Sequence, residues 1–163
     1  MSVRPASTDD IEAVRTVARD SWEADYPEIM SRETVDEAVD RWYSPEQVHS
    51  AVENPRMFLL VAEHDTEPVG FVHAFLDDDA SVVLRLYVHP EHRGENIGTK
   101  LFEEIRDQLF EHGVERLHAM VLAANEPGNR FYQSLGLERV DSGETTAGGE
   151  SFTEHTYELQ SEG

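Results

Sequence analysis

The sequence predicts an α/β fold in which a mixed sheet of about seven strands is flanked by about four to five helices. Two observations lead to this prediction. Residues 82–110 change from strand periodicity to helix periodicity around a short turn, and strand-like and helix-like segments are interspersed along the rest of the chain. With 163 residues, 39% of them hydrophobic, the chain is long enough for one core, so residues 1–163 are expected to form a single domain.

Residues 82–110 are expected to form a strand, a turn and a helix. In the strand, apolar residues recur at every second position and are expected to share one face: Val82, Leu84, Leu86 and Val88. In the helix they recur at helical spacing: Ile97, Leu101, Ile105 and Leu109. Pro90 and Gly94 interrupt both patterns. This order directs the first N–H groups of the helix beyond the end of the strand, where an anion can bind.

The segments before this unit are expected to be a short strand, three helices and a hairpin. The strand begins at Val3, and the first helix runs from Thr8 to about Glu23. Ser31 is expected to cap a second helix, and Ser44 with Pro45 begins a third. Two apolar runs, residues 57–62 and 69–76, are expected to pair as antiparallel strands.

The segments after it complete the sheet. A strand at 117–123 is followed by a helix that starts near Asn125 and ends at Gly136. A sixth strand contains Val140, residues 142–150 are expected to be a Gly/Thr loop, and 152–159 form the last strand. The strands at 82–88 and 117–123 are expected to be parallel neighbours joined by a right-handed crossover. Because ligands bind beyond the carboxyl ends of such strands, residues 93–98 and Asn125 are expected to converge there.

The charge and the composition exclude several classes of protein. There are 34 acidic and 13 basic residues, a formal net charge of −21, and Lys100 is the only lysine. We interpret this as a surface suited to high salt, as in a halophile, with an ordinary acidic protein as the alternative. Nucleic acid is not expected as a partner, because phosphate binding needs a basic patch. No cysteine, signal-peptide pattern or membrane-length apolar run is present, so we expect a cytoplasmic protein without disulfides.

The turn at residues 93–98 fits neither of two common phosphate-binding motifs. The GxxxxGK[ST] pattern fails because Gly94 and Gly98 are separated by three residues and Thr99 precedes Lys100. The GxGxxG pattern fails as well. However, Arg93-Gly-Glu-Asn-Ile-Gly98 resembles the Q/R-x-x-G-x-G/A motif of the GNAT superfamily of N-acetyltransferases. The segment Asn125-Glu-Pro-Gly-Asn-Arg-Phe-Tyr-Gln-Ser-Leu-Gly136 resembles the second signature of that family, N-x-x-A-x-x-F-Y-x-x-x-G-F.

The resemblance spans nearly the whole chain and implies an acetyl-CoA-dependent N-acetyltransferase. It implies that acetyl-CoA is the co-substrate and that Tyr132 protonates the departing thiolate. It also implies that the backbone of the strand before the turn holds the pantetheine arm and polarises the thioester carbonyl. The cofactor-binding residues implied are Leu86, Tyr87, Val88, Arg93, Gly94, Glu95, Asn96, Ile97, Gly98, Thr99, Asn125 and Tyr132.

Several of these residues also have a purely structural interpretation. Tyr132 could be a core aromatic residue on an amphipathic helix, and Asn125 could simply cap that helix. Asn96 stands where the family has its first glycine. Asparagine tolerates the left-handed region better than other side chains do, so we expect the loop shape to be kept while the approach to the coenzyme becomes tighter.

No general base is assigned from the sequence. Many members of the family carry a glutamate early on the strand before the loop, but here that region begins with Ser81 and contains no carboxylate. Possible substitutes, each of which could equally be structural, are His73, His118, Glu23 and Asp25. His89 and His92 are close in sequence but have no third ligand in view, so no metal is expected.

The predicted function is transfer of an acetyl group from acetyl-CoA to a primary amine by direct attack in a ternary complex. The acceptor could be a small amine, an amino acid derivative or a protein N-terminus. The expected acceptor wall consists of the first two helices, with Trp22, Tyr26 and Trp42, and the 142–150 loop. A homodimer is possible, and no membrane partner is expected. The alternative is a non-catalytic acyl-CoA-binding or regulatory module.

Overall fold

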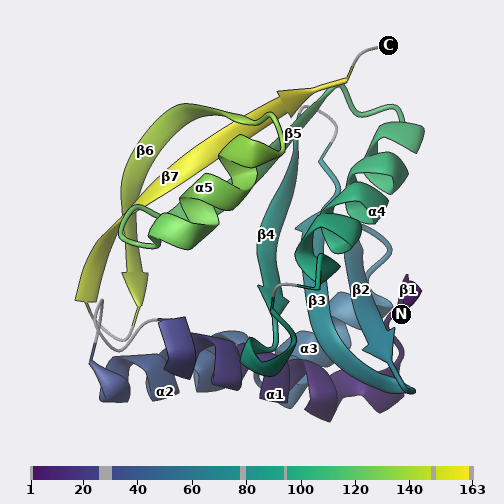
Figure 1. Ribbon diagram of the computed structural model, residues 1–163, viewed down its shortest axis with the longest axis vertical. Helices are drawn as coiled ribbons and strands as arrows, with labels where there is room; N and C mark the ends of the chain where they lie inside the picture. Colours follow the sequence, from purple (N-terminus) through teal and green to yellow (C-terminus); the bar gives the residue numbers. More distant parts are fainter. Residues whose placement is uncertain (1, 26–30, 78–79, 94, 148–149, 162–163) are drawn as a thin grey trace.

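In the residues that this computed structural model describes, seven strands form one mixed sheet in the order β1-β2-β3-β4-β5-β7-β6 (Figure 1). The described residues are 2–25, 31–77, 80–93, 95–147 and 150–161. The strands are β1 (Ser2–Pro5), β2 (Met57–His64), β3 (Glu67–Phe75), β4 (Ser81–Val88), β5 (Arg116–Leu122), β6 (Glu138–Ala147) and β7 (Glu150–Gln160). The predicted α/β fold with a mixed sheet is confirmed.

Five α-helices connect these strands within the described part of the chain. They are α1 (Ile11–Asp25), α2 (Arg32–Trp42), α3 (Pro45–Glu53), α4 (Ile97–Glu111) and α5 (Glu126–Ser134). Two single turns of 3₁₀-helix, η1 (Thr8–Asp10) and η2 (Pro90–His92), precede α1 and α4. Among the described helices, none has both the length and the apolar character needed to cross a membrane.

Different helices cover the two faces of the sheet (Figure 1). On one face α4 and α5 pack against the strands, and Leu101 and Ile105 of α4 are fully buried there beside Val83. On the other face α1, α2 and α3 form a second core, which includes Val39 of α2 and Phe71 of β3. Full burial of one such side chain contributes roughly 1.5–3 kcal/mol. The two cores therefore hold the sheet from both sides and fix where its strands end.

A β-bulge at Leu84 changes the faces that the side chains of β4 occupy. Consecutive residues of β3 pair with Val83 and Arg85, so Leu84 is the extra residue. Val83, rather than the predicted Val82, is therefore fully buried beneath α4. The prediction of one common face is correct only for its second half, Leu86 and Val88, which do pack against this core. The apolar residues alternate without interruption in the sequence, whereas the bulge shifts the strand by one residue. The alternation therefore predicted the wrong face for the residues that precede the bulge.

β4 and β5 are parallel neighbours, as predicted, but only over a short distance. Their pairing starts with Ser81 opposite Leu117 and ends with Val83 opposite Ala119. Beyond that point β4 turns away from β5 towards α1 (Figure 1). The separation coincides with the bulge at Leu84, because a bulge bends and twists its strand. A space between the two strands follows from this geometry.

The prediction of a loop over residues 142–150 is wrong. β6 continues to Ala147 and pairs with β7, from Glu138 opposite Glu158 to Ala147 opposite Glu150. Glycine is depleted in strands, so the composition indicated a loop. Gly143 nevertheless lies inside β6, where a Cβ would meet open space. The hydrogen bonds that β6 forms with β7 along its whole length outweigh the weak preference of its residues for a loop. Residues 148 and 149 lie outside the described part of the chain.

His73 is a largely buried imidazole on the face of β3 that packs against α1 and α3. It lines a small cavity with Tyr43, Val48 and Phe71, and its Nε2 has no hydrogen-bond partner among the described residues. Burial first, and the charge of Arg85 second, lower the pKa of His73 to about 4. The imidazole is therefore neutral in the folded protein near pH 7.

We expect His73 to make the folded state less stable as the pH falls from its ordinary pKa of 6.5 to about 4. Between these two pH values His73 is protonated in the unfolded chain but not in the folded protein, so lowering the pH favours unfolding. Above pH 6.5 His73 is neutral in both states and has no effect on the pH dependence of stability. The free energy of unfolding should fall by roughly 3 kcal/mol in total across this pH range. Urea unfolding at several pH values should show this loss for the wild type and a flatter profile for His73→Leu.

The matched control is His49→Leu, because the His49 side chain is 56% exposed. This variant should keep the wild-type pH dependence. A His73→Leu variant whose profile parallels the wild type would contradict the assignment.

Candidate active site

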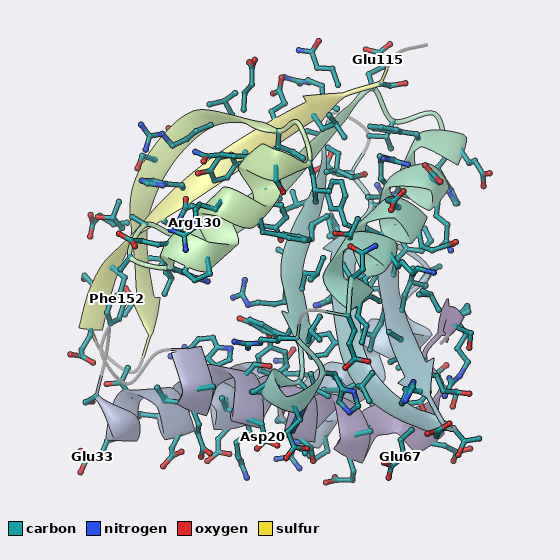
Figure 2. All side chains as sticks on the ribbon, in the orientation of Figure 1. Asp20, Glu33, Glu67, Glu115, Arg130 and Phe152 are labelled. Carbon is teal, nitrogen blue, oxygen red and sulfur yellow. The ribbon has the colours of Figure 1, made fainter. Side chains whose placement is uncertain are left out.

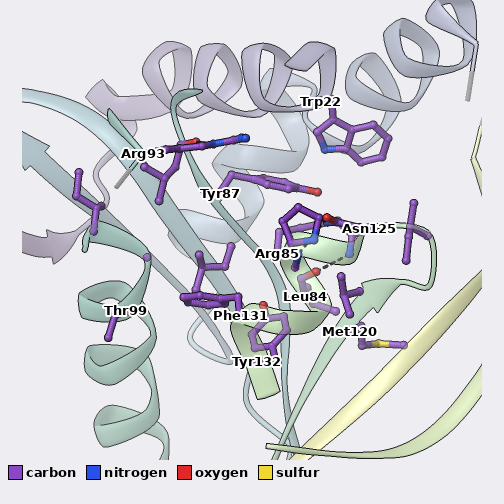
Figure 3. Close-up of a pocket in the computed structure, with 18 of the residues that line it drawn as sticks. Trp22, Leu84, Arg85, Tyr87, Arg93, Thr99, Met120, Asn125, Phe131 and Tyr132 are labelled. Atoms are coloured by element: carbon purple, nitrogen blue, oxygen red, sulfur yellow. Dashed lines mark hydrogen bonds between the residues drawn. The ribbon is translucent and has the colours of Figure 1, made fainter. Parts of the chain in front are cut away.

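A cavity of about 490 Å³ lies where β4 and β5 separate (Figure 3). Its walls come from residues 84–88 of β4 and 120–122 of β5, from the turn and first residues of α4, and from α5. In the described residues, the backbone of β4 after Val83 has no partner in β5. The amide groups of this stretch that point away from β3, with which β4 remains paired, are therefore available to a ligand with amide groups of its own.

The first turn of α4 forms one end of this cavity. Lys100 N–H donates the first intrahelical bond to the carbonyl oxygen of Asn96 at 3.3 Å, so the N–H groups of residues 97–99 precede the helical ladder. Residues 96–99 line the cavity together with Arg93. These N–H groups and the helix dipole favour an anion at this end.

Asn96 adopts the left-handed conformation, with φ 65° and ψ 18°. This conformation is what a glycine would supply in the turn, and asparagine is one of the few other residues that adopt it readily. Asn96 thus adopts the left-handed conformation that the expected loop shape requires of it. Gly94, also a predicted binding residue, lies outside the described residues.

The start of α5 forms the opposite wall. Asn125 Oδ1 accepts a hydrogen bond from Gly128 N–H at 3.1 Å, so Asn125 caps the helix while also lining the cavity. A Cβ on Gly128 would lie 2.7 Å from Asn125 Nδ2 and 2.8 Å from a methyl carbon of Val121. Glycine at this position therefore allows α5 to approach β5 closely.

Tyr132 points from α5 towards the strand that carries Arg85 and Tyr87 (Figure 3). The residue is only 5% exposed, and its ring packs edge-on against Phe102 and Phe131. Its hydroxyl makes no hydrogen bond to another described residue. Burial raises the pKa of Tyr132 above its usual range, so the phenol is protonated at neutral pH.

Most of the predicted cofactor-binding residues line this cavity. They are Leu86, Tyr87, Val88, Arg93, Asn96, Ile97, Gly98, Thr99, Asn125 and Tyr132. Glu95 is absent from the lining; its carboxylate instead lies 3.3 Å from Nδ1 of His92. The close arrangement of Arg93, Asn96 and Asn125 follows from the parallel β4–β5 pair, as the sequence indicated.

The substitutes considered for a general base lie elsewhere. His73 lies in the small cavity between β3 and the leading helices, and His118 Nε2 is 3.0 Å from a carboxylate oxygen of Glu158. Glu23 is not among the lining residues, and the side chain of Asp25 lies outside the described part. His89 Nε2 lies 2.7 Å from Asp20 Oδ2, which ties η2 to α1.

Thr145 of β6 lines the cavity and lies in the 142–150 segment expected to form part of the acceptor wall, whereas Glu154 of β7, also a lining residue, was not found from the sequence. Both fall in the region where a loop and a short closing strand were expected. Of the predicted aromatic acceptor wall, Trp22 does line the cavity (Figure 3). Tyr26 and the side chain of Trp42 lie outside the described residues.

Comparison with known proteins identifies the family. A model of the Acetyltransferase (GNAT) family matches residues 11–137. The chain belongs to the GNAT family. This GNAT protein is 28% identical, over 97% of its length and 98% of the relative, to spermidine N(1)-acetyltransferase of Thermoplasma acidophilum. It is also 27% identical to a putative ribosomal protein bS18 alanine N-acetyltransferase of Bacillus subtilis, over 60% of this chain and 64% of that one.

The fold of this GNAT protein is closely similar to a solved structure. The PaiA N-acetyltransferase of Thermoplasma acidophilum, in complex with coenzyme A, superposes with a TM-score of 0.88 at 26% identity and covers 98% of both chains. The predicted enzyme class and co-substrate are thus confirmed: the protein transfers an acetyl group from acetyl-CoA to an amine.

We expect the conformation of Asn96 to control coenzyme binding. Asn96→Gly should bind coenzyme A about as tightly as the wild type, because glycine adopts the same backbone conformation freely. Asn96→Val should bind about tenfold or more weakly, because a β-branched residue with positive φ costs on the order of 1–3 kcal/mol. Isothermal titration calorimetry with coenzyme A measures both.

Asp65→Val is the matched control. Asp65 also has a positive φ, 51°, but lies in the β2–β3 turn. This variant should lose stability without losing affinity for coenzyme A. Equal affinities of the valine and glycine variants at position 96 would refute the role of the turn conformation.

Proposed function

We propose that the protein acetylates a cationic primary amine by direct attack in a ternary complex, at the cavity between β4 and β5. The observation that carries this proposal is the meeting of three groups there. The first turn of α4, the open backbone edge of β4 and the phenol of Tyr132 all line one space. An anion-binding end, an amide-binding edge and a proton donor are what acyl transfer from a long phosphorylated thioester requires.

In this proposal the N–H groups of residues 97–99 and Arg93 hold the pyrophosphate of the coenzyme. The backbone of residues 86–88 pairs with the pantetheine arm, as a neighbouring strand would. Acetyl-CoA supplies the acetyl group as a thioester whose carbonyl carbon can be attacked by an uncharged amine. The same backbone N–H groups are positioned to stabilise negative charge on the carbonyl oxygen.

Tyr132 is the proposed proton donor to the sulfur. Its raised pKa keeps the phenol protonated, which is the form that a general acid must have. It reaches the cavity from α5, whereas the amine is proposed to enter from the side of α1 and β6, past Trp22 and Thr145. Donor and acceptor therefore approach from different walls.

A polyamine-like acceptor is the version of this proposal that the relatives favour. The spermidine acetyltransferase relative matches 97% of this chain, whereas the ribosomal-protein acetyltransferase relative matches 60%. The acceptor side of the cavity also contains a carboxylate, that of Glu154. A carboxylate favours a cation over a neutral amine.

Thiol release from acetyl-CoA across a panel of amines tests the proposal. The panel contains alkyl polyamines, amino acid amides and a peptide with an N-terminal alanine. We expect the polyamines to give the highest kcat/KM. Saturable coenzyme A binding without turnover on any amine would instead support the non-catalytic acyl-CoA-binding module.

In the same assay Tyr132→Phe should lower kcat by about 100-fold, because it removes the proton donor, and should change the KM for acetyl-CoA little. Tyr43→Phe is the control, because Tyr43 is a buried tyrosine outside this cavity. A Tyr132→Phe enzyme with nearly wild-type kcat would rule out the assigned role.

We further propose that the protein works in the cytoplasm of a cell with high internal salt. The acidic residues are spread over the molecule rather than gathered at one site, as Glu33 on α2, Glu67 on β3 and Glu115 before β5 illustrate (Figure 2). With a net charge of −21, self-repulsion falls as salt shortens the Debye length from about 10 Å at 0.1 M to about 3 Å at 1 M.

The free energy of unfolding should therefore rise with salt. Thermal unfolding in potassium chloride and in a non-ionic osmolyte of equal osmolality separates screening from solute exclusion. The melting temperature should increase between about 0.1 M and about 1 M salt by several degrees more than in the osmolyte. An unchanged melting temperature would reject the high-salt interpretation.

A further inference from the structure

Glu154 provides the single carboxylate among the described residues that line the acetyl-CoA cavity. It lies on β7 directly opposite Leu122 of β5 and Gly143 of β6. Residue 122 is the last of β5 and borders the cavity, so Glu154 is held at its edge by pairing on both sides. The chain has 34 acidic residues, so the position of Glu154, and not its type, distinguishes it.

The Glu154 carboxylate is half-buried and makes no hydrogen bond or close ion pair with another described residue. Buried or half-buried carboxylates usually have such a partner. Two other acids with little exposure do: the buried Asp10 accepts two hydrogen bonds from Arg4, and Glu158 pairs with His118. A half-buried acid that faces a cavity and forms no hydrogen bond or close ion pair is suited to receive a cationic group from a ligand.

Glu154 and the proposed proton donor, Tyr132, share one charged neighbour. Arg85 acts electrostatically on both Glu154 and Tyr132, and it projects between Trp22 and Tyr132 (Figure 3). The ionisable side chains that line the cavity with Glu154 are those of Arg85, Tyr87, His92, Arg93 and Tyr132. Of these, His92 and Arg93 belong to the turn before α4, at the end proposed for the phosphates.

We propose that Glu154 binds the ammonium group of the acceptor and removes one of its protons, and so acts as the general base of the reaction. The inference rests on the proposed function. The N–H bond of the ammonium breaks, its electron pair stays on nitrogen, and a carboxylate oxygen of Glu154 gains the proton. That proton passes to solvent, which matches the single proton released when an alkylammonium becomes an amide. The base thus comes from β7, and the β4 carboxylate that other family members carry is not needed.

The environment of Glu154 supports this role. Desolvation raises its pKa and the Arg85 charge acts in the opposite direction, with a net increase. A carboxylate with a raised pKa accepts a proton more readily than an exposed one, as general-base catalysis near neutral pH requires. Its ionised form also attracts the ammonium, since partly desolvated opposite charges interact more strongly than exposed ones.

The test compares Glu154→Gln with Glu154→Asp and with the control Glu158→Gln. Glu158 lies four residues further along β7, outside the cavity, and undergoes the same change of charge. Each variant is assayed with an alkyl polyamine, whose amines are charged at neutral pH, and with methoxyamine, which is already neutral. Binding of the polyamine to the coenzyme-free protein is measured by calorimetry, and coenzyme A binding and thermal unfolding are measured alongside.

Glu154→Gln should lower kcat/KM for the polyamine by about 100-fold near neutral pH, while methoxyamine turnover stays close to that of the wild type. The acidic limb of the pH profile, present in the wild type, should be lost in Glu154→Gln and kept in Glu154→Asp. Polyamine binding to the coenzyme-free protein should weaken, and coenzyme A binding should not change. Glu158→Gln should match the wild type in turnover, pH profile and ligand binding.

The inference is overturned if Glu154→Gln keeps the wild-type pH profile with the polyamine, or if it loses activity on both acceptors equally. The second result would indicate a structural role. These outcomes differ from failure of the proposed function itself, in which the wild-type protein would turn over no amine.

Discussion

The end of hydrogen bonding between β4 and β5 after Val83 is the constraint on which the active site depends. If the parallel ladder continued, the backbone N–H and C=O groups of β4 and β5 would hydrogen-bond to each other and no space would remain between the two strands. Because it stops, the backbone of β4 must find other partners, and a ligand with amide groups can supply them. Two separate cores, one under α4 and α5 and one under α1 to α3, hold the strands apart.

The sequence predicted the parts of the site that depend on local chemistry. The strand–turn–helix unit, the cap at Asn125 and the left-handed Asn96 all follow from preferences expressed within a few residues. Parallel pairing of β4 with β5 then brings Arg93, Asn96 and Asn125 together, because consecutive strands joined by a helix crossover have restricted geometry. These elements needed no knowledge of distant contacts.

The parts that the sequence did not predict depend on distant contacts. The length of β6 is set by β7, and local composition indicated a loop instead. The choice of Glu154 could not be made from a chain with 34 acidic residues, since any of them can take a proton. Glu154 and Glu158 lie on the same strand but differ in their surroundings: Glu154 lines the cavity, whereas Glu158 pairs with His118.

The bulge at Leu84 has a consequence for how such a site can change during evolution. The extra residue places Arg85 and Tyr87 on the side of α1, and Leu86 and Val88 under α4. Removing one residue here would exchange these two sets: an arginine would enter the apolar core and leucine would replace it at the acceptor side. A substitution along β4 changes one side chain on one face, whereas a change in the number of residues alters both faces at once. We therefore expect an insertion or deletion in this strand to damage the site more than a single substitution does.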